Sequence, residues 1–208
     1  MFKQYKLGKV NQDRLFGHLP TAIRSVLLTK PMMGSVVLGG GAIRSSFSKE
    51  YPHDYDLFFL NQEYARNVEL MLVNHHGYKV IFRCPLGELI SLQCGPVKIQ
   101  LILKRTYSSI EEMLNSFDFT VTQFATVDCV TLWSNRQAIK DAKKKSLRVA
   151  AITYPVASLN RVQKYLRYGF IPCSDFYKSL AIAVADAMWL IKLQTEEEQA
   201  KSLALYVD

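Results

Sequence analysis

Cysteine is scarce in this chain, and the few cysteines present follow no pattern. Cys84, Cys94, Cys129 and Cys173 are the only four among 208 residues, and no two of them have the CxxC spacing. This argues against a disulfide framework and against a zinc site, and it favours reduced thiols in a cytoplasmic compartment. The first residues, MFKQYKLGKVNQDR, lack the apolar core of a signal peptide, so no export signal is expected.

Long apolar runs are also missing. The longest, Leu180 to Leu193, is interrupted by Asp186 and is too short to cross a bilayer. We therefore expect no membrane partner and interpret this run as a helix packed against protein. It forms either the core of a helical region or a dimer surface, with Ser174 as its N-cap.

Acidic residues are outnumbered 18 to 26 by basic ones, which gives a formal charge of +8. The excess is concentrated between residues 136 and 167, where Asp141 is the only acid. Such a stretch favours a polyanionic partner, although a solvated basic face is the alternative. The candidate RNA-binding residues are Lys143, Lys144, Lys145, Arg148, Arg161, Lys164 and Arg167.

The order of elements predicts an α/β (α+β) chain without repeats or low-complexity segments. A hydrophobic fraction of 49% is enough for a sizeable core. Periodicity and turn residues predict helices near 10–17, 20–28, after Gly41 and from an Asn61 cap to Gly77, and strands near 35–38, 55–60, 78–83, 88–93 and 97–103. After a capping box formed by Ser108 and Glu111, the chain is expected to be mostly helical.

One glycine turn stands out within the stretch VVLGGGAIRSSF. Gly39, Gly40 and Gly41 follow a predicted strand and open a predicted helix. Glycine allows a sharp turn and a close approach of the backbone to a ligand, and the following helix N-terminus favours phosphate. Arg44 and Ser45 lie in the first turns of that helix and are candidate phosphate donors.

Two aspartates follow this turn after a short helix. Asp54 and Asp56 are two residues apart, so on an extended chain their carboxylates point to one face and can share divalent cations. A phosphate cradle beside a carboxylate pair suits a two-metal transfer of a nucleotidyl group. An ordinary turn with solvated aspartates is the alternative for either feature taken alone.

The stretch GGAIRSSFSKEYPHDYDLFF resembles the signature of the DNA polymerase β superfamily of nucleotidyltransferases. It is most similar to the branch of bacterial poly(A) polymerases and CCA-adding tRNA nucleotidyltransferases, whose pattern is GGxVRD followed by a proline and DxD. Ser45 replaces the aspartate of the first element. FDFTVTQFA is similar to the RDFTxNA motif of this branch and retains Asp118, and the resemblance extends from about Val36 to Phe170.

This resemblance implies a small mixed nucleotidyltransferase sheet with flanking helices in residues 1–125, followed by a basic helical neck in residues 126–208. It implies that Gly40, Gly41 and Arg44 bind the triphosphate of ATP or CTP, that Asp54 and Asp56 bind two Mg²⁺ ions, and that Asp118 lies near the nucleotide sugar. The implied activity is template-independent transfer of a nucleotide to an RNA 3′ end, with tRNA as one acceptor, and the implied protein is a minimal form of the enzyme.

The chain departs from the family pattern at two places. Gln100 occupies the position where many members of the superfamily carry a third metal-binding acid. Thr153, Tyr154 and Ala157 fall where the branch has its base-reading EDxxR element, so we expect looser base selection, with Tyr154 stacking on the base. Two other functions remain open: transfer to a non-RNA acceptor, and an inactive fold that binds RNA or a protein partner.

Some aromatic residues near these motifs allow two interpretations. His53, beside Asp54, is expected to be a solvent-exposed neighbour of the metal rather than a general base. Tyr165, Tyr168 and Phe170 either stack on bases or pack in the core of the neck.

Overall fold

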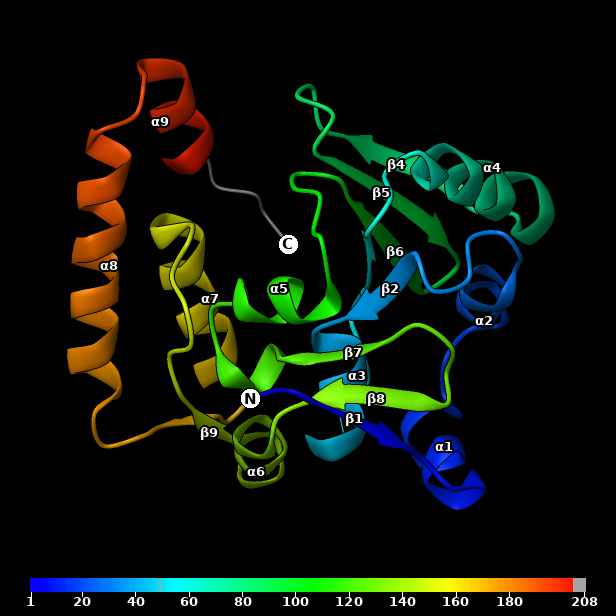
Figure 1. Ribbon diagram of the computed structural model, residues 1–208, viewed down its shortest axis with the longest axis horizontal. Helices are drawn as coiled ribbons and strands as arrows, with labels where there is room; N and C mark the ends of the chain where they lie inside the picture. Colours follow the sequence, from blue (N-terminus) through cyan, green and yellow to red (C-terminus); the bar gives the residue numbers. More distant parts are fainter. Residues whose placement is uncertain (49, 204–208) are drawn as a thin grey trace.

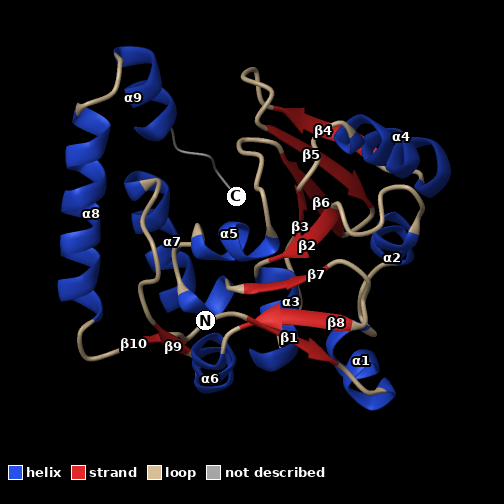
Figure 2. Cartoon of the chain, viewed as in Figure 1, coloured by secondary structure: helices blue, strands red, loops and turns tan. Residues whose placement is uncertain are grey.

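The computed structural model of the protein describes residues 1–48 and 50–203 (Figures 1 and 2). The last five residues of the expected neck lie outside this range. An eight-stranded mixed sheet is built in the order β1 (Lys3–Lys6), β8 (Thr131–Ser134), β7 (Phe124–Thr126), β2 (Val36–Gly39), β3 (Tyr55–Phe59), β6 (Val97–Ile102), β5 (Leu89–Cys94) and β4 (Lys79–Arg83). Only β3 and β6 pair in parallel within it.

Helices surround this sheet and form a second region beside it. They are α1 (Lys9–Phe16), α2 (Thr21–Leu28), α3 (Gly41–Ser48), α4 (Tyr64–His76), α5 (Ile110–Asn115), α6 (Arg136–Lys144), α7 (Pro155–Arg167), α8 (Phe176–Lys192) and α9 (Glu196–Leu203). A 3₁₀ turn, η1 (Thr120–Thr122), and a short parallel pair, β9 (Ser146–Leu147) with β10 (Ile171–Pro172), complete the described chain. None of the helices in these residues has the length and hydropathy that a bilayer span requires.

The sheet has two faces because side chains alternate along each strand. On β3, Leu57 and Phe59 are fully buried in the main core, together with apolar residues of α1, α2, α3, α4 and α6. Burying a side chain such as Phe59 contributes about 1.5–3 kcal/mol to folding. Phe58 points to the opposite face, where α5 supplies Met113 and Leu114 to a smaller cluster. Helices thus cover one face of β3 fully and leave part of the other face open.

The second region has its own apolar core. Helices α7 and α8 pack on the chain around η1, and α7 lies between α8 and the sheet (Figure 1). Phe119, Tyr165 and Phe176 form the centre of this cluster, with the Phe119 ring 5.5 Å from that of Tyr165 and 6.2 Å from that of Phe176. A helical neck after the sheet, as the resemblance implied, is therefore present.

The expectation of a mostly helical chain after Ser108 is wrong between residues 124 and 134. Strands β7 and β8 form a hairpin that joins the same sheet, so the sheet continues past the expected division after residue 125. Its turn is built by Asp128, whose carboxylate accepts hydrogen bonds from the N–H groups of Val130 and Thr131. Cys129 there adopts a positive φ of 56°. A hairpin held by an aspartate carboxylate carries no glycine or proline signal.

Three predicted helix caps are shifted by one or two residues. The N-cap of α5 is Ser109, which accepts from the N–H of Glu112, rather than Ser108. Asn61 accepts from the N–H of Glu63 in a turn that precedes α4. The N-cap of α8 is Asp175 rather than Ser174, and no side-chain hydrogen bond closes that end. Local side-chain hydrogen bonds of this kind are available to neighbouring Ser, Asn and Asp residues alike, so sequence alone does not choose between them.

Candidate functional site

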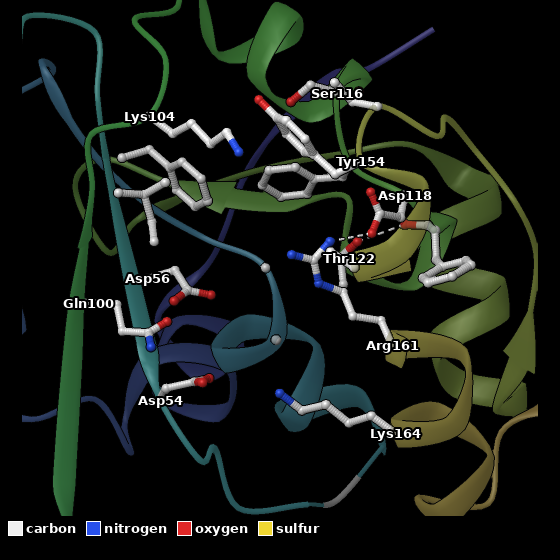
Figure 3. Close-up of a pocket in the computed structure, with 18 of the residues that line it drawn as sticks. Asp54, Asp56, Gln100, Lys104, Ser116, Asp118, Thr122, Tyr154, Arg161 and Lys164 are labelled. Atoms are coloured by element: carbon white, nitrogen blue, oxygen red, sulfur yellow. Dashed lines mark hydrogen bonds and ion pairs between the residues drawn. The ribbon is translucent and has the colours of Figure 1, made fainter. Parts of the chain in front are cut away.

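A cavity of about 220 Å³ opens between the uncovered face of the sheet and helix α7. Figure 3 shows the side chains that converge on it from both regions. The residues that carry polar groups into it include Arg44, His53, Asp54, Asp56, Gln100, Lys104, Asp118, Tyr154, Arg161 and Lys164. Most of the residues predicted to bind nucleotide are therefore brought together in one place.

The glycine turn lies at the edge of this cavity, beside one of the aspartates. Gly40 has a φ of +78°, a conformation that favours glycine, and its N–H donates to the carbonyl of Phe124 at 2.9 Å. A Cβ built on Gly40 would stand 3.6 Å from Asp56 Oδ2. Both Gly40 and Gly41 line the cavity, and α3 begins at Gly41. A helix N-terminus of the kind that favours anions thus lies next to a carboxylate.

Asp54 and Asp56 both line the cavity at the start of β3. Asp54 immediately precedes the strand, and Asp56 pairs with Gly39 on one side and Gln100 on the other. Both carboxylates are partly exposed. Because both carboxylates line the same cavity, they present hard oxygen ligands of the kind that fit a divalent cation.

Gln100 supplies an amide where a third carboxylate would complete the set. In the amide orientation that satisfies both neighbours, its Nε2 donates to Asp56 Oδ1 at 2.9 Å and its Oε1 accepts from Lys98 Nζ at 2.9 Å. Among the side chains that the structure describes, no group of three or more His, Cys, Asp or Glu is arranged to hold a metal ion. Any metal at this site would rest on Asp54 and Asp56.

Arg44 is buried at the junction of the two regions, with only 5% of its surface exposed. Its Nη2 lies 3.2 Å from Glu50 Oε2, and its guanidinium carbon lies 5.2 Å from the Tyr165 ring centre and 5.3 Å from that of Phe170. Lys145 Nζ approaches the other oxygen of Glu50 at 2.7 Å. Arg44 Nε has no hydrogen-bond partner among the described residues. A buried donor of this kind beside a cavity is a candidate ligand for phosphate.

Ser45, the other predicted phosphate donor on α3, is not brought to the cavity. Its side chain is buried, and its Oγ donates to the carbonyl of Ala42 at 2.7 Å. The residue that replaces the family's aspartate therefore bonds to its own helix.

Tyr154 and Asp118 lie at another part of the cavity, together with two cations. The Arg161 guanidinium forms an ion pair with Asp118 (Figure 3). Lys104 Nζ lies 3.8 Å from the centre of the Tyr154 ring and 3.8 Å from Glu88 Oε2. Burial raises the pKa of the Tyr154 hydroxyl and lowers the pKa of Lys104. One face of Tyr154 is thus covered by a lysine, which leaves the other face as the candidate stacking surface.

Sequence reasoning missed Lys104 as a cavity residue. Ile102 and Lys104 follow Gln100 at intervals of two, and all three line the cavity. Gln100 and Ile102 share a face of β6 because residues i and i+2 of a strand do, and Lys104 lies two residues past the end of this strand.

The basic residues predicted to bind RNA have different surroundings. Lys143 and Lys144 are exposed in the last turn of α6, where cations stabilise the helix terminus. Besides its contact with Glu50, Lys145 donates to the carbonyl of Tyr168. Arg148 lies near two carboxylates, with Nε 3.4 Å from Asp141 Oδ2.

The last two of these cations, Lys164 and Arg167, lie on α7. Lys164 lines the cavity, whereas Arg167 lies on an adjoining groove.

Tyr165 and Phe170 are buried, which confirms core packing for these two aromatic residues. Tyr168 is only half-buried and stacks on His53, with the ring centres 5.3 Å apart and the planes at 2°. His53 is exposed, as expected, and lines the cavity beside Asp54.

The fold is that of nucleotidyltransferases. A CCA-adding enzyme in complex with ATP superimposes on 96% of this chain and 50% of its own, with a TM-score of 0.68 and 17% identity. A tRNA nucleotidyltransferase complexed with a primer tRNA and an incoming ATP analog covers 81% of this chain and 51% of its own, with a TM-score of 0.54 and 22% identity. The chain therefore spans about half the length of these structures.

Sequence comparison leads to a narrower group. The Gabija anti-defense 2 protein of Bacillus phage SPbetaL7 is 29% identical over 133 residues, which are 62% of this chain and 32% of that protein. The model of the Gabija anti-defense 2 family matches residues 18–145, more than half of the chain, including the glycine turn, both aspartates and Asp118. On this match, the chain belongs to the Gabija anti-defense 2 family.

Proposed function

We propose that this protein transfers a nucleoside monophosphate from a nucleoside triphosphate to the 3′ end of an RNA, with release of pyrophosphate. The observation that carries the proposal is the convergence of Gly40, Gly41, Arg44, Asp54 and Asp56 on one cavity. A glycine turn, a helix N-terminus and a carboxylate pair are what in-line nucleotidyl transfer needs, because its catalysis consists mainly of positioning and charge neutralisation.

In this proposal the triphosphate lies against the start of α3. The backbone N–H groups after Gly40 and the orphaned Nε of Arg44 donate to phosphate oxygens. The aromatic rings around Arg44 and the carboxylate of Glu50 hold its guanidinium in place, so little side-chain freedom is lost when phosphate binds.

Asp54 and Asp56 would hold the divalent cations. Bound Mg²⁺ supplies charge neutralisation at the attacking and leaving oxygens of the transfer. Gln100 contributes by fixing one oxygen of Asp56 through its amide N–H. An amide cannot ionise, so Gln100 adds no negative charge. The negative charge that balances the metal ions would come from the two carboxylates.

The base would lie at the other part of the cavity. Its ring stacks on the face of Tyr154 that Lys104 leaves open, and Asp118 and Arg161 offer an acceptor and donors. Tyr154 does not distinguish one base from another by hydrogen bonding, so modest selection among the four nucleotides is expected, with ATP or CTP as the first candidates.

The biological role of the transfer and the identity of its acceptor are the more specific part of the proposal. The matched phage protein and family are named for counteracting the Gabija defence, and we propose that the transfer serves that purpose rather than tRNA maturation. The same membership favours one second candidate, transfer of the nucleotide to a non-RNA acceptor such as a protein hydroxyl or another nucleotide.

The test uses each α-labelled nucleoside triphosphate with Mg²⁺ and three acceptor pools: total bacterial RNA, total bacterial protein and no macromolecule. Label in RNA that is sensitive to ribonuclease supports the proposal. Label that resists ribonuclease and is removed by protease supports the second candidate. An absence of label in all three pools, with protein that binds none of the four nucleotides in equilibrium dialysis, contradicts both.

A further inference from the structure

One face of helix α7 is polar and opens onto a groove. Asn160, Gln163, Lys164, Arg167 and Tyr168 line this groove. Their spacing of three and four residues places them on a single face of the helix. Lys164 and Tyr168 also line the catalytic cavity, so the groove and the cavity share a wall.

The two cations of this face differ in their surroundings from Lys145 and Arg148. Lys145 and Arg148 lie within 4 Å of carboxylates of the same chain. Among the side chains that the structure describes, those of residues 1–48 and 50–203 except 197, 201 and 202, none forms an ion pair with Lys164 or Arg167. Arg167 is exposed, and Lys164 extends from α7 toward the end of the cavity where Asp54 lies (Figure 3). Their charges are available to phosphate groups.

An aromatic pair stands where the groove meets the cavity. The imidazole of His53 is parallel to the ring of Tyr168, and His53 is exposed. Arg44 approaches the Tyr168 ring at 5.8 Å. The outer face of His53 is thus the open surface of this pair, and it lies one residue from Asp54 in the chain. Flat exposed rings among cations are the elements that bind single-stranded nucleic acids without strong sequence preference.

We propose that the α7 groove is the path of the acceptor strand, and that the His53–Tyr168 pair stacks on its 3′-terminal base. Lys164 and Arg167 contact the last phosphates, while Asn160 and Gln163 contact sugars or bases. The terminal hydroxyl is then directed toward Asp54 and Asp56. This inference rests on the proposed function for its direction, since nucleotidyl transfer requires a 3′ end beside the two aspartates.

The test measures binding without transfer. A ten-nucleotide single-stranded RNA carries 2-aminopurine either at its 3′ end or at its fifth nucleotide, and is titrated with the protein in EDTA without nucleotide. Stacking quenches 2-aminopurine, so we expect strong quenching of the 3′ label and little of the internal one. His53→Ala should abolish the 3′ quenching and weaken binding about tenfold. Equal quenching of both labels, or His53→Ala indistinguishable from wild type, would overturn the proposal.

Matched variants separate a local effect from a loss of structure. His75→Ala removes another exposed histidine, at the end of α4, and should leave the quenching unchanged. Tyr168→Phe keeps the ring and should keep the quenching. Arg167→Ala should weaken binding and flatten its dependence on salt, whereas Lys192→Ala, which removes an exposed cation of α8, should not. Loss of quenching in the histidine control as well would contradict the assignment to His53.

Because this assay needs neither metal nor nucleotide, its outcome is independent of whether the protein catalyses transfer. Quenching of the 3′ label with no incorporation from any triphosphate would support the groove as the RNA-binding path and contradict the proposed function. Incorporation into RNA without 3′ quenching would retain the function and reject the groove.

Discussion

Neutralising Glu50 tests how the two regions of the protein are joined. Its carboxylate lies between two cations, with Arg44 Nη2 at 3.2 Å and Lys145 Nζ at 2.7 Å. The Arg44 side chain is 6% exposed and that of Glu50 is 21% exposed, so the pair is largely shielded from water. Glu50→Gln keeps the shape of the side chain and leaves Arg44 as a buried cation without its counter-charge.

The size of the effect follows from these surroundings. Removing one partner of a fully buried ion pair costs about 3–5 kcal/mol. Partial exposure of Glu50 and the three rings around Arg44 reduce this, since a cation over an aromatic face retains about 0.5–2 kcal/mol. We expect Glu50→Gln to lower the free energy of unfolding by about 2–3 kcal/mol. For a chain of this size that lowers the melting temperature by about 4–12 °C.

The assay is urea unfolding followed by far-UV circular dichroism, with Asp13→Asn as the matched control. Asp13 pairs with Lys9 at 3.3 Å, but their side chains are 63% and 81% exposed. An exposed pair contributes less than about 1 kcal/mol, so this control should change stability little. If Glu50→Gln and Asp13→Asn destabilise the protein equally, the buried junction does not hold the two regions together as argued.

Three further predictions follow from the site and its surroundings. If Lys164 and Arg167 contact RNA phosphates, each change to alanine should reduce the slope of log affinity against log salt by roughly 0.7, and an unchanged slope in fluorescence anisotropy titrations would exclude those contacts. Tyr154→Ala should weaken binding of all four nucleoside triphosphates by similar factors, and in equilibrium dialysis the loss of only one nucleotide would show that this residue selects the base instead of stacking on it. Burial raises the pKa of the Cys129 thiol to about 11, so at pH 8 a maleimide should label exposed Cys94 quickly and Cys129 only on unfolding, and fast labelling of both by mass spectrometry would contradict its burial.

The raised pKa of the Cys129 thiol also predicts how the stability of the protein changes with pH. A raised pKa in the folded state means that the unfolded chain loses this proton first as pH rises. The contribution of Cys129 to stability is therefore complete below its unfolded pKa, near 8.5–9, and is lost as pH rises toward about 11.

Local motifs predict the part of the candidate site that lies on a continuous stretch of chain. The glycine turn and the two aspartates were predicted from about twenty residues, because strand, turn, helix and strand follow one another there and alternation fixes which side chains share a face. The structure brings Gly40 and Asp56 together as that pattern implies.

Contacts between residues that are distant in the sequence could not be predicted from local motifs. Three contacts of the site join residues that are far apart in the sequence. Arg161 and Asp118 are 43 positions apart, and Tyr154 and Lys104 are 50 positions apart. The aromatic rings around Arg44 begin 121 positions after it. Such contacts depend on how the neck packs against the sheet, about which local propensity says nothing. The position of Ser45 in the first turns of α3 could be predicted from the sequence, but the direction of its side chain could not. That side chain turns back to its own helix.

The β7–β8 hairpin was missed for a different reason. Its turn lacks the glycine that usually marks a hairpin, and Asp128 takes over by accepting backbone hydrogen bonds through its carboxylate. The helical chain expected after Ser108 is present at α6 but not at the strands before it.

The most direct test of the central claim compares nucleotide incorporation by the wild-type protein and by Asp56→Asn. The assay is the initial rate of transfer from α-labelled triphosphate to RNA in Mg²⁺, with unfolding of both proteins followed in parallel. The account predicts that Asp56→Asn reduces the rate by at least about a thousandfold (~4 kcal/mol), while its melting temperature stays within a few degrees of the wild-type value or rises, because two unmetallated carboxylates repel each other. Near-normal incorporation by a folded Asp56→Asn variant would contradict it.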